Sequence, residues 1–174
     1  MSDFHYLHFA GVPTLATALA PDDPELTGLL RRAGSISDWR VLTLELGPGK
    51  EVDYLANSFA FRLCSQRLQA AIDQSRSPVD VLNWLPCRVV RRDRSVVAYS
   101  ILHFPEVPDV LDHDKSIHSG PVLVKAVLNK QLAERHHVFG FPRDSLRLIV
   151  NEALRTTIEN MGLTGMTFSK VAAV

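Results

Sequence analysis

The sequence predicts an α+β fold in which a mixed or antiparallel sheet carries a few helices, arranged as two related strand–helix–strand units. In residues 62–73 an apolar run leads to Ser65, and a leucine, an isoleucine and an acid follow three, seven and eight residues later. Residues 148–159 repeat this spacing after Asn151. Serine and asparagine at a helix start accept hydrogen bonds from its free amides, and the spacing gives the helix one apolar face. Each segment is therefore predicted to be a strand that runs into a capped helix.

The first third of the chain is predicted to be rich in strands. A strand at 5–9 is ended by a glycine and a proline, and an apolar run at 39–46 is closed by the turn residues 47–49. Between these strands, the sequence Pro-Asp-Asp-Pro-Glu at 21–25 predicts a turn that leads into a short helix at 26–30.

The middle of the chain predicts a helix followed by a hairpin. The helix that starts after Ser65 should end before the Ser-Pro pair at 77–78, because proline does not continue a helix. The runs 81–90 and 96–102 are strand-like, and the polar residues 92–95 between them are typical of a tip. These two runs are predicted to pair as a hairpin.

The last third predicts a long polar loop and further strands. The loop covers residues 105–120, and strands are expected at 122–128 and 138–141. After the second capped helix, Gly162 is expected to adopt the left-handed conformation that ends a helix. A final strand is predicted at 166–171.

Length and composition predict one α+β domain, residues 1–174, with residues 1–52 as an N-terminal lobe. A chain of 174 residues with 46% hydrophobic residues can bury roughly 70% of its extended surface. No apolar run approaches the roughly 18 residues that a membrane span requires, and the N-terminal residues do not resemble a signal peptide. We therefore expect no membrane contact and a cytoplasmic location, where Cys64 and Cys87 are buried thiols.

The charge of the chain is balanced but unevenly distributed. Residues 61–105 carry seven bases and three acids. Four of these bases, Arg88, Arg91, Arg92 and Arg94, lie in or near the predicted hairpin tip. No stacking aromatic residues alternate with them and the isoelectric point is about 7.1, which disfavours nucleic acid as a partner. The arginines predict a solvated tip or a contact with an acidic protein.

The sequence offers few candidates for chemistry. It contains no Gly-x-Ser-x-Gly elbow, and Ser65 is interpreted as a helix cap rather than a nucleophile. Loop residues Asp112, Asp114 and His118 are the best candidates to converge on a metal ion, as in a small metal-assisted hydrolase. The alternative for these residues is a solvated polar loop. No cofactor is predicted.

Six short motifs follow one another in a defined order over residues 53–171. They are 64–68, 84–89, 110–116, 137–139, 149–154 and 162–168. In their order and spacing the chain resembles bacterial polymorphic-toxin immunity proteins of the type first described from myxobacteria, long catalogued as a domain of unknown function. Asn151 stands where that family tends to have serine, which preserves the helix cap. The family-like region is residues 53–174.

The resemblance implies a protein that neutralises a co-encoded toxin by binding it, without catalysis. Such a protein needs about 800 Å² of shaped surface and complementary charge. We predict Asp112 and Ser116 as partner-binding residues, because their loop lies in a matching motif and has little packing reason to be polar. Arg91, Arg92 and Arg94 are predicted as partner-binding residues from the positive charge of the hairpin tip. For Asp112 the alternative is a cap on a local turn. The alternative functions are the metal-assisted hydrolase and a structural homodimer joined through an exposed strand edge.

Overall fold

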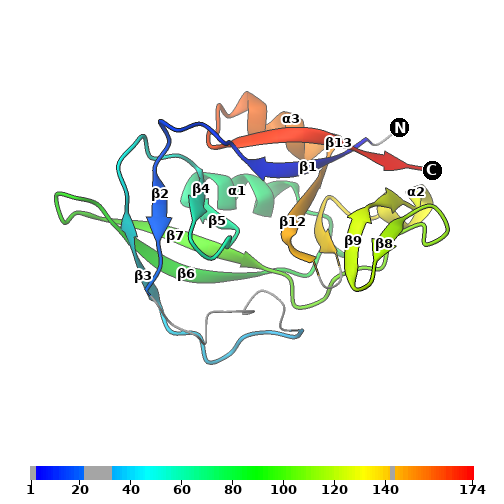
Figure 1. Ribbon diagram of the computed structural model, residues 1–174, viewed down its shortest axis with the longest axis horizontal. Coiled ribbons are helices and arrows are strands. Elements are labelled where there is room, and N and C mark those ends of the chain that lie inside the picture. Colours follow the sequence, from blue (N-terminus) through cyan, green and yellow to red (C-terminus); the bar gives the residue numbers. More distant parts are fainter. Residues whose placement is uncertain (1–2, 22–32, 142–143) are drawn as a thin grey trace.

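The computed structural model describes residues 3–21, 33–141 and 144–174. It confirms the α+β prediction with a five-stranded sheet, a closed six-stranded barrel and a separate two-stranded hairpin (Figure 1). The sheet contains, in spatial order, β10 (Val127–Leu128), β13 (Met166–Ala173), β1 (Phe4–Phe9), β12 (Asp144–Asn151) and β11 (Val138–Phe141). The barrel contains β2 (Thr17–Leu19), β3 (Leu42–Leu46), β6 (Asn83–Val90), β7 (Val96–His103), β5 (Leu63–Ser65) and β4 (Tyr54–Asn57). The other elements are α1 (Gln66–Ser75), α2 (Lys130–Ala133), α3 (Glu152–Asn160), β8 (Ile117–Ser119) and β9 (Val122–Lys125).

Both predicted helix caps are present. The Ser65 side chain accepts a hydrogen bond from the Leu68 amide at 3.2 Å, and the Asn151 side chain accepts one from the Leu154 amide at 2.9 Å. Gly162 follows α3 with a φ of +61°, as predicted. The buried faces of α1 and α3 join one apolar cluster that also contains residues of β1, β4 and β7, so this cluster connects the helices to both the sheet and the barrel.

The two strand–helix–strand units share a topology that the sequence did not reveal. In the barrel, β5 and β6 flank β7 and both run antiparallel to it. In the sheet, β12 and β13 flank β1 and both run antiparallel to it. α1 connects β5 to β6, and α3 connects β12 to β13. In each unit the two strands are parallel and separated by one antiparallel strand, which is a split β–α–β unit.

Most of the predicted strands are observed, with one correction. The runs 81–90 and 96–102 pair as the antiparallel β6–β7 hairpin, and the strand at 39–46 is β3. The run 122–128 was predicted as one strand, but it forms β9 and β10, which belong to different sheets. The burial pattern explains the division, because three consecutive residues from Ala126 are buried and no alternating strand can bury them all on one face. The predicted turn and helix at 21–30 lie outside the described residues.

Segments from the first 52 residues enter both β-structures. β1 lies inside the five-stranded sheet, whereas β2 and β3 belong to the barrel. The division into a lobe at 1–52 and a family-like region stays a prediction. In the described part of the chain, no helix combines the length and the apolar character that a membrane crossing requires.

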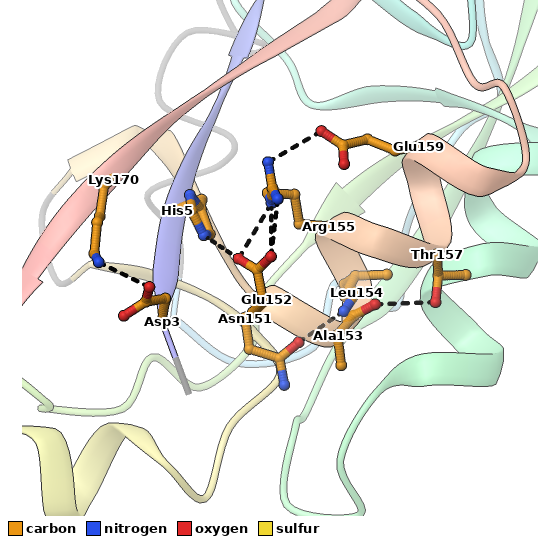
Figure 2. Close-up of polar contacts among 10 residues, drawn as sticks. All are labelled: Asp3, His5, Asn151, Glu152, Ala153, Leu154, Arg155, Thr157, Glu159 and Lys170. Atoms are coloured by element: carbon orange, nitrogen blue, oxygen red, sulfur yellow. Dashed lines mark hydrogen bonds and ion pairs between the residues drawn. The ribbon is translucent and has the colours of Figure 1, made fainter. Parts of the chain in front are cut away.

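A polar network fixes β1 to the first turn of α3. Figure 2 shows His5 of β1 bound to Glu152, which also pairs with Arg155 one turn later. Arg155 continues to Glu159 at 3.1 Å. The hydrogen bond from Arg155, followed by the one from His5, lowers the pKa of Glu152. The negative charge thus lies at the positive end of the helix dipole.

Candidate protein-interaction site

The β6–β7 hairpin projects from the barrel and ends in a tight tip (Figure 1). The Arg91 amide donates to the Ser95 carbonyl at 2.9 Å, and the Arg94 amide donates to the Arg91 carbonyl at 2.9 Å. Asp93 accepts hydrogen bonds from both the amide and the hydroxyl of Ser95, which lowers the pKa of its carboxyl group. Arg94 has a φ of +66°, a conformation that favours glycine. The tip is therefore a defined structure.

The tip arginines fall into two groups. Arg91 is an anchor, because its guanidinium binds both carboxylate oxygens of Glu51 at 2.7 and 3.2 Å. Arg92 and Arg94 are exposed and, within the described residues, form no ion pair. Arg88 is exposed on β6, opposite Ala98 of β7. Three guanidinium groups are thus presented to solvent on or next to one projecting hairpin.

The other two predicted site residues shape the loop that contains them. Asp112 accepts from the Lys115 amide at 3.1 Å and pairs with the Lys115 ammonium at 3.0 Å. This hydrogen bonding lowers the pKa of Asp112. Ser116 binds both main-chain groups of Val127, donating to the carbonyl at 3.1 Å and accepting from the amide at 3.0 Å. Asp112 therefore caps a turn, the alternative interpretation of the sequence, and Ser116 ties the loop to β10.

The structure does not bring the two predicted site regions together. The tip of the β6–β7 hairpin is at one end of the molecule, whereas β8 and β9, which follow the loop, are at the other end (Figure 1). One partner surface of ordinary size is therefore centred on one region or the other.

The metal-binding hypothesis gains no support from the geometry. The carboxylate of Asp112 forms an ion pair with Lys115, and His113 pairs with Asp109 at 3.0 Å. Over residues 3–21, 33–141 and 144–174, no group of three or more histidine, cysteine, aspartate or glutamate side chains is placed to hold a metal ion.

The candidate nucleophiles have structural roles. Cys64 is fully buried, and burial raises the pKa of its thiol far above the usual range. Burial likewise raises the pKa of Cys87 to about 12. The hydroxyl of Ser65 donates to Asp53 at 2.7 Å while it caps α1. A protonated thiol and a fully bonded hydroxyl are poor nucleophiles.

A pair formed by half-buried His136 and buried Asp80 was missed by sequence reasoning. His136 binds Asp80 at 2.9 Å beside a cavity of about 140 Å³. Asp80 also accepts from the amides of Ser77, His137 and Val138. The described residues that line this cavity include no serine, threonine or cysteine. We interpret Asp80 as the group that fixes the start of β11 to the segment after α1. No local pattern indicates the pair, because His136, His137 and Val138 lie 56 to 58 residues from Asp80 in the sequence.

Residues 41–173 match the Immunity protein family (Imm11). The match covers most of the chain, which therefore belongs to this immunity protein family. It does not address the myxobacterial type, which stays a prediction. Comparison with individually curated proteins gave no match.

Proposed function

We propose that the protein neutralises a co-encoded bacterial toxin by direct binding, without catalysis, in the cytoplasm of the producing cell. The observation that carries the proposal is the family match over residues 41–173. Neutralisation by occlusion requires a shaped and charged surface rather than a reactive group. The structural roles of Cys64, Ser65 and Asp112 are consistent with that requirement.

We further propose that the hairpin tip contacts an acidic surface of the toxin. Arg92 and Arg94 place positive charge at the exposed tip, Arg88 adds to it on β6, and Arg91 fixes the tip through Glu51. Exposed charges of one sign accelerate encounter with a surface of opposite charge. The positive φ of Arg94 is consistent with this role, because strained non-glycine residues cluster at functional sites.

Co-expression tests the proposed function. The toxin domain encoded by the neighbouring gene is produced in bacteria with and without this protein, and growth and complex formation are measured. We expect the protein to restore growth and to co-purify with the toxin domain. Failure of both would reject the function.

Charge reversal tests the hairpin tip. We expect the double variant Arg92→Glu and Arg94→Glu to slow association roughly tenfold or more at low salt, with a smaller effect at high salt. Arg135→Glu, at an exposed position away from the tip, serves as the control for a change in total charge.

Asp112→Asn and Ser116→Ala test the predicted loop site. Weaker binding by these loop variants without loss of stability, together with normal binding by the tip variant, would move the interface to the loop.

A further inference from the structure

One edge of the five-stranded sheet is only partly paired. β13 pairs with β1 from Met166 to Val171. On its other edge, β10 pairs only with Ala172 and Ala173. In the described part of the chain, no strand pairs with this edge of β13 between Met166 and Lys170. An unpaired edge presents main-chain donors and acceptors to an incoming strand.

The register identifies the outward main-chain groups. The Ala10 amide donates to the Gly165 carbonyl at 2.9 Å, which makes this a hydrogen-bonded pair at the start of the β1–β13 ladder. Bonded and non-bonded pairs alternate in an antiparallel ladder. The amides of Met166, Phe168 and Lys170 therefore point away from β1, toward the open edge.

A groove of about 420 Å³ lies beside this edge. Its floor is the face of β1 and β13 that carries Tyr6, His8 and Ser169, and its wall is the segment 124–126. β9 lies close to the sheet, because Arg147 of β12 donates to the Leu123 carbonyl at 2.9 Å. If a strand were added to this edge, those of its side chains that lie on the groove's face of the sheet would enter the groove.

The groove is basic with an apolar rim. Lys125 is exposed and forms no ion pair within the described residues, and His8 is exposed and bound to the Ser169 hydroxyl at 2.8 Å. The described residues that line the groove include no carboxylate. On β9, Val122 and Val124 are 60% and 55% exposed. This surface is therefore complementary to an acidic segment with some apolar side chains.

We propose that an extended acidic segment of the toxin polypeptide adds a strand to the open edge of β13 and places its side chains in the groove. This inference rests on the proposed function and adds a second contact, remote from the hairpin tip, which an extended segment of the toxin reaches outside the area of one compact interface. Strand addition supplies affinity through main-chain hydrogen bonds, and the groove supplies specificity. A second copy of this chain is a poorer occupant, because pairing two β13 edges would bring the basic grooves together.

The outward amide of Lys170 allows a matched test. Lys170→Ala removes the ammonium group, including its 2.7 Å ion pair with Asp3 (Figure 2), but keeps the amide. Lys170→Pro removes the amide as well, and an edge strand tolerates proline. We expect Lys170→Pro to bind the purified, catalytically inactivated toxin domain roughly tenfold more weakly than Lys170→Ala. Equal affinity of two folded variants would overturn the inference.

Charge in the groove is tested independently. Lys125→Glu should weaken binding of the same toxin domain roughly tenfold, whereas Arg135→Glu should leave it unchanged. Hydrogen exchange of the wild-type complex covers the case in which Lys170→Pro does not fold. The amides of Phe168 and Lys170 should exchange more slowly when the toxin domain is bound.

The outcomes separate the two proposals. A wild-type protein that neither binds the toxin domain nor protects cells from it refutes the proposed function itself. Wild-type binding with unchanged exchange at Phe168 and Lys170 refutes only strand addition. A stable dimer in light scattering that Lys170→Pro dissociates would instead assign the edge to a second copy, and would also overturn the inference.

Discussion

Asp53, which precedes β4, binds Thr164, which precedes β13, and thereby joins the barrel to the sheet. One carboxylate oxygen accepts from the Thr164 amide at 2.9 Å and from its hydroxyl at 3.2 Å. The other accepts from Ser65, the cap of α1, at 2.7 Å. The main chain repeats the connection, since the Tyr54 amide donates to the Thr164 carbonyl at 3.0 Å. A single buried carboxylate therefore links two β-structures and a helix start.

Removal of this carboxylate should be strongly destabilising. We expect Asp53→Ala to lower the free energy of unfolding by about 3 kcal/mol, because it leaves the Thr164 amide and the Ser65 hydroxyl without their charged acceptor. Arg67 lies 3.7 Å from Asp53 with 60% of its side chain exposed, so Arg67→Ala should cost no more than about 1 kcal/mol. Urea unfolding measures both. Similar losses for the two variants would contradict this role of Asp53.

Replacement of Gly165, at the same junction, should strongly destabilise the protein. This residue has a φ of +91°, and an added Cβ would lie 2.5 Å from both the Tyr54 carbonyl oxygen and a methyl group of Val52. We expect Gly165→Ala to destabilise the protein by about 3 kcal/mol or more. Gly162→Ala is the matched control, because Gly162 also has a positive φ but faces open space. Its expected cost in urea unfolding is about 1 kcal/mol.

Stability should depend on the protonation of His103. The side chain is fully buried and its Nε2 lies 2.9 Å from the Gly34 carbonyl oxygen. Burial lowers the pKa of His103 below 6.5. The unfolded chain therefore takes up this proton first, so the contribution of His103 is complete above pH 6.5 and is lost as the pH falls through the folded-state pKa. Between about pH 7.5 and about pH 5, the free energy of unfolding should fall less for His103→Gln than for the wild type. For the control His118→Gln, at an exposed position, it should fall as much as for the wild type.

Arg94→Gly should separate stability from binding. Glycine relieves the positive φ at this position, so we expect the free energy of unfolding to rise by about 0.5–1 kcal/mol. The same change removes a guanidinium from the tip, and we expect weaker binding to the toxin domain. Thermal unfolding and titration with the toxin domain measure the two effects. A variant that is both more stable and fully active in binding would exclude Arg94 from the interface.

The sequence predicted the elements that depend on local chemistry. The caps at Ser65 and Asn151 and the glycine stop at Gly162 are properties of neighbouring residues, and the β6–β7 hairpin needs only a short polar connection. Barrel closure was not predicted, because the parallel pairing of β3 with β6 joins residues about 45 positions apart. Such pairing has no local signal.

The sequence could indicate a candidate site only where its residues lie in one continuous segment of the chain. Four arginines close together in the sequence indicated the tip, and the structure shows which of them is an anchor only through Glu51, 40 residues away. The groove beside β13 combines side chains from the first strand, the segment at 124–126 and the last strand. Its basic character therefore became visible only after the sheet had been assembled.

The projection of the β6–β7 hairpin beyond the barrel has an evolutionary consequence. Side chains at its tip, apart from Arg91 with its link to Glu51, take no part in the barrel interior. Under the proposed function, mutations there can accumulate while the scaffold keeps its stability, so the binding surface can change as the surface of the toxin diverges. Within the tip, position 94 is restricted by its backbone conformation, and Asp93 and Ser95 are restricted by the hydrogen bonds between them.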